Sequence, residues 1–394
     1  MCRFLKNPYR EENPKWTPEV TAPFESREIT DLHRSLDVYR PTPLVSLPEL
    51  ARQLGVGKIF VKDESKRFGL KAFKALGGTY AVYRFLSRYY KERGKFVSLA
   101  RNFYRNTGAI EPGKFTFCTA TDGNHGRGVA WTARLLRQRA VIFMPANTVA
   151  SRVENIEMEG ARVVKIDGTY DETVAAMAEQ AGANGWQIIS DMSWAGYEEI
   201  PRWIMAGYTT LFEEIDKSLG PKENLDLAVI PAGCGALAGT AAWHYNRTLG
   251  TSRPGLLAVE PADADCIMAS IASKNGSICS LRGGQHSIMA GLNCGTPSPV
   301  AWPLIKSGFD FFLTIPDRAA VAAMRTYGRP LGEDEAIISG ESGAAGLAAL
   351  TTLMTSESML AARERVGLNS ESSVLLLNTE GDTDPEHYAR AMAS

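Results

Sequence analysis

The chain has 394 residues, ample for a large buried core and, at roughly 150 residues a domain, suggestive of two or three domains. Its 43 lysines and arginines nearly balance 44 aspartates and glutamates, so the charge indicates neither nucleic acid nor an anionic membrane surface as a partner. The charged N-terminal residues Met1–Lys6 lack the apolar stretch of a signal peptide, and no apolar run approaches the ~20 residues of a membrane span. We therefore expect a globular protein of the cytoplasm.

Short apolar strands alternate along the chain with amphipathic helices, which predicts an α/β fold with mainly parallel sheets. The expected strands are Lys58–Lys62, Phe115–Cys118, Ala140–Met144, Ala161–Ile166, Trp186–Ile189, Leu227–Ile230, Leu256–Val259 and Val374–Leu377. The expected helices include Arg127–Leu136, Arg152–Met158 and Asp171–Ala183. Residues 87–184 would form a small domain, and residues 1–86 with 185–394 a large one. The polar, turn-rich segment Arg101–Pro112 is expected to be a surface excursion.

Lys74 is the first candidate for chemistry. It opens a helix after a polar turn, among the apolar residues Phe73, Ala75 and Leu76. Burial in such surroundings lowers the pKa of an amine, and a neutral amine can attack a carbonyl. A lysine at a helix start often only extends its ammonium group to solvent. The motifs downstream decide between these two interpretations.

A glycine-containing turn lies between the strand at 115–118 and the next helix, with Asn124 at its centre. Glycines let a backbone approach a ligand closely, and a helix N-terminus directs free N–H groups at an anion such as a substrate carboxylate. Asn124 carries an amide suited to a phenolate oxygen. The residues of this turn are Thr121, Asp122, Gly123, Asn124, His125 and Gly126.

A second glycine turn follows the strand at 227–230 and again leads into a helix, a pattern typical of a phosphate cradle built from backbone amides. Its candidate cofactor-binding residues are Gly233, Cys234, Gly235, Ala236, Leu237, Ala238 and Gly239. A lysine, an asparagine turn and a phosphate turn in this order predict pyridoxal 5′-phosphate (PLP), held as a Schiff base on Lys74 with the phenolate oxygen near Asn124.

The chain resembles the fold type II PLP enzymes, and within them the diaminopropionate ammonia-lyases, from about Tyr39 to Tyr388. The resemblance implies two three-layer α/β/α domains with the cofactor between them, and a homodimer. Threonine dehydratases and serine racemases usually carry serine at the position of Asp122, which favours the narrower family. The stretches that carry the resemblance are residues 62–70, 121–128, 194–197, 288–292, 338–343 and 379–384.

The resemblance also implies the reaction, α,β-elimination of ammonia from D- and L-2,3-diaminopropionate to pyruvate and two ammonia, with serine as a slower substrate. Asp122 would remove the Cα proton of the D-isomer and Asp191 that of the L-isomer. A carboxylate that acts as a base near neutral pH needs a raised pKa, so each acid should be partly buried. From the residues alone, Asp122 could instead cap a helix and Asp191 could be an ordinary turn acid.

Further site residues follow from the same resemblance. Thr379 would face the pyridine nitrogen and leave it unprotonated, which favours elimination; otherwise it caps a turn at a strand end. Cys266 and Cys294 lie in segments like those of the family, and whether they form a disulfide or remain free thiols is left open. The expected substrate-binding residues are Ser65, Thr121, Asp122, Gly123, His125, Asp191 and Tyr197. The dispersed histidines and cysteines give no metal-binding pattern.

Two alternatives remain at this stage. The second glycine turn, followed by Glu260 at the end of the strand at 256–259, imitates a dinucleotide fingerprint with its acidic ribose partner, as in a nicotinamide-dependent oxidoreductase. Such an enzyme would need neither Lys74 nor the turn at 121–126. A serine or threonine dehydratase is the nearest competitor within PLP chemistry.

Overall fold

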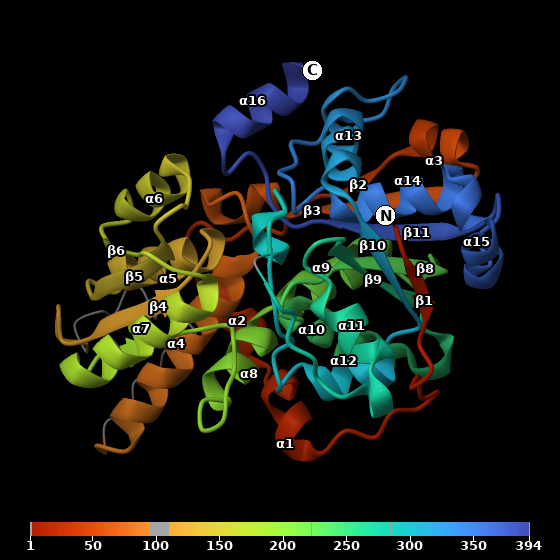
Figure 1. Ribbon diagram of the computed structural model, residues 1–394. Helices are drawn as coiled ribbons and strands as arrows, with labels where there is room; N and C mark the ends of the chain where they lie inside the picture. Colours follow the sequence, from red (N-terminus) through yellow and green to blue (C-terminus); the bar gives the residue numbers. More distant parts are fainter. Residues whose placement is uncertain (1, 95–109, 222, 284, 394) are drawn as a thin grey trace. The chain divides into compact units, whose positions relative to one another are not determined.

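The computed structural model describes residues 2–94, 110–221, 223–283 and 285–393. Most of the segment expected to be a surface excursion, 101–112, lies outside these residues. The chain divides into two compact units. Unit 1 comprises residues 1–18, 41–66 and 211–394, and unit 2 comprises residues 19–40 and 67–210. Each unit is built around its own sheet (Figure 1).

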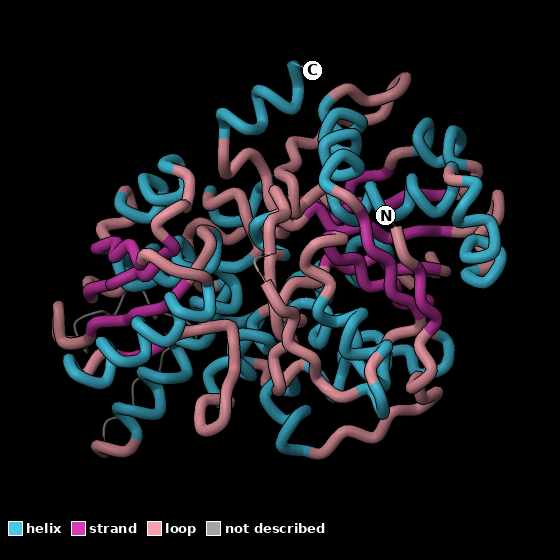
Figure 2. The backbone as a smooth tube through the Cα atoms, in the orientation of Figure 1, coloured by secondary structure: helices cyan, strands magenta, loops and turns pink. Residues whose placement is uncertain are grey.

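Unit 1 contains a seven-stranded sheet in the order β1-β10-β9-β8-β11-β3-β2 among the described residues. Its outer strands β1 and β2 are antiparallel to their neighbours, and the other strands pair in parallel. The strands are β1 (Phe4–Lys6), β2 (Leu44–Ser46), β3 (Lys58–Asp63), β8 (Leu227–Pro231), β9 (Gly255–Pro261), β10 (Phe311–Ile315) and β11 (Ser373–Asn378). Figure 2 shows these strands side by side with helices on both faces.

The helices of unit 1 cover both faces of its sheet, as parallel strands require. Figure 1 shows α10, α11 and α12 on one side and α13 and α14 on the other. The strand β8 is buried along its whole length, and the almost wholly apolar α14 packs across β8–β11. The helices are α3 (Pro48–Leu54), α9 (Thr209–Leu219), α10 (Ala236–Leu249), α11 (Cys266–Ala272), α12 (Trp302–Gly308), α13 (Asp317–Gly328), α14 (Ala345–Thr355), α15 (Leu360–Val366) and α16 (Pro385–Ala393).

Unit 2 contains a four-stranded, all-parallel sheet in the order β6-β5-β4-β7 within the described ranges. One face packs against α7, where the alternating residues Val141 and Phe143 meet Met177. The helix α5 lies against β4 and β5, and α4 packs along α5 and α8. The elements are β4 (Thr116–Ala120), β5 (Arg139–Pro145), β6 (Arg162–Ile166), β7 (Gln187–Ile188), α1 (Pro18–Thr21), α2 (Glu28–Arg34), α4 (Lys74–Lys91), α5 (Asn124–Leu135), α6 (Ala150–Glu157), α7 (Tyr170–Asn184) and α8 (Glu199–Gly207).

The α/β fold with mainly parallel sheets is confirmed, and the expected strands and helices are present with shifts of a few residues at their ends. The limits of the two units differ from the domain limits expected at 86/87 and 184/185, which both fall inside unit 2. The first of these would cut α4, which packs along α5 and α8. Within the described residues, no helix is long and apolar enough to cross a membrane.

Candidate active site

The chain reaches Lys74 through a strained loop. Phe68 and Lys71 adopt left-handed backbone conformations, with φ of +52° and +60°, which disfavour residues other than glycine by about 1 kcal/mol each. The Phe68 ring is buried and stacks on Trp131 with 5.4 Å between the ring centroids. Phe73, Ala75 and Leu76 are all buried, so α4 begins at Lys74 with an apolar anchor around it. The loop therefore fixes where the amine emerges.

Lys74, Asp191 and His125 form a cluster in unit 2. Nζ of Lys74, whose side chain is 17% exposed, donates to Oδ2 of Asp191 at 2.5 Å. Nε2 of His125 lies 2.7 Å from the carbonyl of Ile189, and because a carbonyl only accepts, Nε2 carries the proton. Burial lowers the pKa of His125, so the neutral ring directs its bare Nδ1 toward Asp191 Oδ2 at 3.9 Å.

The chain segment that carries Asp191 is held by Tyr197. The Tyr197 hydroxyl accepts a hydrogen bond from the Ser190 amide at 2.8 Å and donates to the Ile188 carbonyl at 3.2 Å. Its ring stacks on Trp194, with centroids 4.2 Å apart and planes 17° from parallel. The hydroxyl expected to bind substrate is thus engaged with the backbone that leads into Asp191.

The turn at 121–126 brings Asp122 to the start of α5. The Thr121 hydroxyl accepts the amides of Gly123 at 3.0 Å and Gly126 at 3.1 Å. These bonds tie the turn to the helix, and they explain why α5 begins at Asn124 instead of at the expected Arg127. Gly123 has a φ of +150°, a conformation that a residue with a Cβ rarely adopts.

The surroundings of Asp122 and Asp191 shift their pKa values in opposite directions. Burial raises the pKa of Asp122 to about 7, with the Asp191 carboxylate adding to the rise and Arg152 and Lys74 opposing it. Burial also raises the pKa of Asp191, but His125 and Lys74, which donates a hydrogen bond to it, outweigh burial and hold that pKa at about 2. Near neutral pH, Asp191 is therefore a carboxylate and Asp122 is divided between its two forms.

The second glycine turn lies in unit 1, between β8 and α10. Gly235 has a φ of +99°, and a Cβ there would come within 2.5 Å of Ile305 Cδ1. A Cβ at Gly233 would meet the Gly291 carbonyl at 3.0 Å. The backbone amides in the first turn of α10 have no hydrogen-bond partner within the helix. The helix is 14 residues long, and the positive end of its dipole lies at this turn. The turn thus fits an anion held by the backbone, and the Cys234 side chain is not needed for that contact.

Ser65 and Thr379 are also buried in unit 1. The Ser65 hydroxyl has no hydrogen-bond partner among the described residues, while its amide donates to Asp63 at 3.1 Å. Thr379 directly follows β11, at the carboxyl end of a central parallel strand. Its neighbour Asn378 donates to Asp63 at 2.8 Å and to the Ile338 carbonyl at 3.0 Å, so the end of β11 is fixed. Ser65 is free to bind a ligand oxygen.

Glu260, the acidic ribose partner in the dinucleotide-binding alternative, has a structural role instead. The Glu260 carboxylate accepts the amides of Ile267 and Met268, each at 2.8 Å, and so caps α11. Burial raises its pKa to about 8. Both oxygens of this buried acid thus bind backbone amides of its own chain, which disfavours a role as ribose partner.

Neither Cys266 nor Cys294 forms a disulfide bond in the structure. Each lies beside Gly233. The Cys266 thiol approaches the Gly233 carbonyl at 3.9 Å, and Cys294 Sγ lies 3.4 Å from where a Gly233 Cβ would be. No cluster that could hold a metal ion is present in the described ranges.

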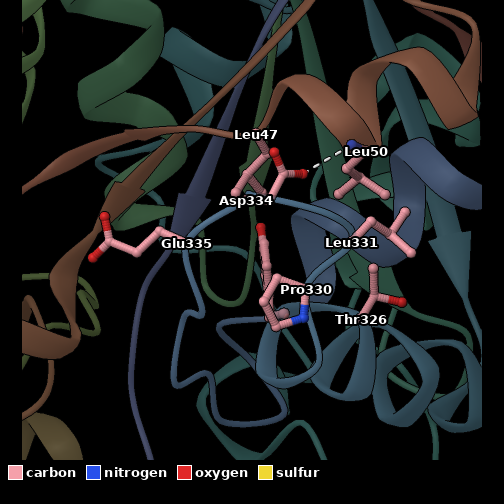
Figure 3. A pocket seen from close by; sticks show the side chains of 8 residues that line it. Leu47, Leu50, Thr326, Pro330, Leu331, Asp334 and Glu335 are labelled. Atoms are coloured by element: carbon pink, nitrogen blue, oxygen red, sulfur yellow. Dashed lines mark hydrogen bonds between the residues drawn. The ribbon is translucent and has the colours of Figure 1, made fainter.

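A pocket in unit 1 is lined by none of the predicted site residues (Figure 3). Asp334 lines it and accepts the amides of Glu49 at 3.0 Å and Leu50 at 2.9 Å, the second and third residues of α3. The pocket is lined by Leu47, Leu50, Thr326, Tyr327, Pro330, Leu331, Asp334 and Glu335. Of its two acids, Asp334 is thus used in capping a helix.

Arg152 is a residue of the site that sequence reasoning did not single out. It lies in the first turn of α6, and its guanidinium donates to the Asp122 carbonyl at 3.4 Å. In the sequence it is one basic residue of an amphipathic helix, and nothing in the pattern there separates it from surface arginines.

Comparison with known proteins finds relatives along almost the whole chain. Residues 36–377 match the family described as pyridoxal-phosphate dependent enzyme. The chain is 41% identical over 370 residues to the diaminopropionate ammonia-lyase of Escherichia coli (strain K12), which covers 92% of this chain and 90% of that relative. Two crystal structures of the E. coli enzyme each share 37% identity and cover 100% of this chain and 97% of that one. The complex with an aminoacrylate-PLP azomethine reaction intermediate superposes with a TM-score of 0.89, and the complex with D-serine with 0.90.

Proposed function

Because the chain belongs to the pyridoxal-phosphate-dependent enzymes, and within them to the diaminopropionate ammonia-lyase family, we propose that it eliminates ammonia from both isomers of 2,3-diaminopropionate. The products are pyruvate and two molecules of ammonia, and serine is a slower substrate. The observation that carries the proposal is the cluster of Lys74, Asp191 and His125, with a second acid, Asp122, that is electrostatically coupled to it.

The residues present fit PLP. Lys74 offers a partly buried amine for the covalent link, and the turn at 233–239 offers backbone amides for the phosphate in a place that a Cβ would fill. Asn124 and Thr379 are our candidates for the phenolate oxygen and the pyridine nitrogen. When bound, the cofactor supplies an electron sink for the pair left on Cα once its proton is removed.

The chain's own acids would then move the proton. Asp122 would take the Cα proton of the D-isomer and Asp191 that of the L-isomer. In each case the Cα–H bond breaks, the proton passes to a carboxylate oxygen, and the amino group leaves Cβ as ammonia after gaining a proton. Tyr197 holds the backbone that leads into Asp191. Released into water, the unsaturated product would hydrolyse to pyruvate and the second ammonia.

Covalent trapping tests the cofactor and its lysine. Borohydride should fix PLP irreversibly to the peptide that contains Lys74, as detected by mass spectrometry. Lys74→Ala should abolish both this adduct and the yellow colour, whereas Lys66→Ala, which alters an exposed lysine, should abolish neither. A colourless protein that gains no activity from added PLP would contradict the proposal.

Pyruvate release assayed on both isomers of diaminopropionate, on serine and on threonine tests the substrate. Preference for diaminopropionate supports the lyase. Preference for L-serine or L-threonine, with neither isomer of diaminopropionate turned over, would identify the dehydratase alternative. Asp122, where dehydratases usually carry serine, favours the first outcome.

We also propose that the protein works as a homodimer in the cytoplasm. The support is the family resemblance for the dimer and, for the compartment, the near-neutral charge, which indicates neither nucleic acid nor an anionic membrane surface as a partner. Light scattering coupled to gel filtration would show twice the mass of one chain. A single-chain mass at micromolar concentration would refute the dimer.

A further inference from the structure

Asp122 can act as a base only in its ionised form, yet it lies in a setting that favours the protonated form. Burial and the Asp191 carboxylate both disfavour its negative charge. Two cations oppose them, Lys74 from α4 and Arg152 from α6. Lys74 is also hydrogen-bonded to Asp191 and, in the proposed function, is the residue that bonds the cofactor. Of the two, Arg152 is therefore the cation whose charge remains available to Asp122 throughout the reaction.

The side chain of Arg152 lies along the turn that carries Asp122. Its Cδ, Cγ and Cβ atoms lie 3.3, 3.6 and 3.7 Å from the position that a Cβ of Gly123 would take. Its Nη1 reaches the Asp122 carbonyl at 3.4 Å. The missing side chain at Gly123, whose φ is +150°, thus makes room for the arginine. Packing and hydrogen bonding together hold the guanidinium at this turn.

We propose that Arg152 is a positioning residue for Asp122, because it fixes the 122–123 turn and holds the acid in its carboxylate form near neutral pH. The ionised fraction of Asp122 in turn sets the rate on the isomer whose Cα proton faces Asp122. This deepens the proposed function and rests on it. Arg152 is not among the groups that shift the pKa of Asp191, so the other isomer does not depend on Arg152.

The first test reads Asp122 directly and needs no substrate. In the holoenzyme, carbon NMR of labelled aspartate carboxyls gives the titration midpoint of Asp122, which Asp122→Asn assigns. Arg152→Met, which keeps the length of the side chain and removes its charge, should move the midpoint up by about one pH unit. Arg152→Lys should restore most of the shift. Arg134→Met is the matched control, because this arginine of α5 is paired with Glu159 at 2.7 Å and should leave the midpoint unchanged.

The second test follows the two isomers. With the midpoint one unit higher, Arg152→Met should lose about fivefold in kcat/KM on the D-isomer at pH 7, recover that loss at higher pH and leave the L-isomer unaffected. If Arg152 instead bound the substrate carboxylate, KM would rise for both isomers without a change in the pH profile, and the proposal would be overturned. An unchanged Asp122 midpoint in Arg152→Met would overturn it as well.

The two tests separate this inference from the proposed function. If wild-type protein turns over neither isomer of diaminopropionate, the proposed function fails. The NMR midpoint still decides whether Arg152 governs the ionisation of Asp122. If both isomers are turned over and the midpoint does not move, only the inference about Arg152 fails.

Discussion

The pH dependence of isomer preference follows from the contrast between the two acids. Asp122, with a pKa raised by burial to about 7, is about one-tenth ionised at pH 6 and about nine-tenths ionised at pH 8. Asp191, with a pKa of about 2, stays ionised across this interval. If each acid serves one isomer, the ratio of kcat/KM for the D-isomer to that for the L-isomer should rise about tenfold between these pH values.

The ratio is the quantity to measure because enantiomers have identical pKa values for their own amino and carboxyl groups. Ionisation of the substrate, of the cofactor and of groups that serve both isomers therefore cancels. Pyruvate formation would be followed with each isomer at several pH values under conditions that give kcat/KM. Asp122→Asn should remove most of the D-isomer activity and leave the L-isomer profile as it was.

A ratio that stays flat from pH 6 to pH 8 would refute this reasoning, because it would mean that both isomers use the same base or that Asp122 is fully ionised. A ratio that falls with pH would be a stronger contradiction, since a protonated Asp122 would then be the active form. Asp191→Asn gives the reciprocal check: it should remove the L-isomer activity, and D-isomer turnover should remain.

Three further substitutions test how the site is supported. Gly235→Ala should destabilise the protein by about 3 kcal/mol, because it adds a Cβ at a positive φ and against Ile305, and should weaken retention of PLP in dialysis. Lys62→Met should lower the free energy of unfolding in urea by about 3–5 kcal/mol, since it leaves the buried Glu214 without its ion-pair partner at 2.7 Å. Tyr197→Phe should lower stability by about 1–3 kcal/mol and reduce L-isomer turnover more than D-isomer turnover, because the amide next to Asp191 loses its acceptor.

Each substitution has a matched control. Gly250→Ala alters the other end of α10 at a φ of +53° where no atom lies within 4 Å, so it should spare PLP retention. Lys58→Met breaks an exposed ion pair in the same strand as Lys62 and should change stability by less than about 1 kcal/mol. Tyr327→Phe removes a buried hydroxyl without a hydrogen-bond partner in the described chain and should not destabilise the protein. A control variant that loses as much stability or PLP retention as the variant it is matched with would count against the stated cause.

The order of strands and helices was predictable because each buried strand is a short apolar run bounded by turn residues. The strand β8 and the turn after it are visible in the sequence for this reason, as is the start of α4 at Lys74. The lysine, the asparagine turn and the phosphate turn were found as local motifs, since each depends on residues that are close together in the chain.

Features that depend on distant residues were not predictable from local patterns. The hydroxyl of Tyr197 turns back to the backbone before Asp191, and Glu260 caps α11, because nearby amides would otherwise be buried unpaired. Arg152 reaches Asp122 only because α6 follows β5, the neighbour of β4 in the sheet. The limits of the two units could not be predicted from local patterns either, because α4 belongs with the smaller sheet only through its packing on α5.

The pairing of β3 with β11 has a consequence for biosynthesis. The ribosome makes β3 early, but its partner β11 is translated only after all of unit 2 and most of unit 1. The four strands of unit 2 are consecutive in the chain and can pair as soon as they emerge. The apolar side chains of Ile59 and Val61 therefore stay exposed until translation is nearly finished. For this reason the nascent N-terminal strands are the part of the chain that most needs a chaperone.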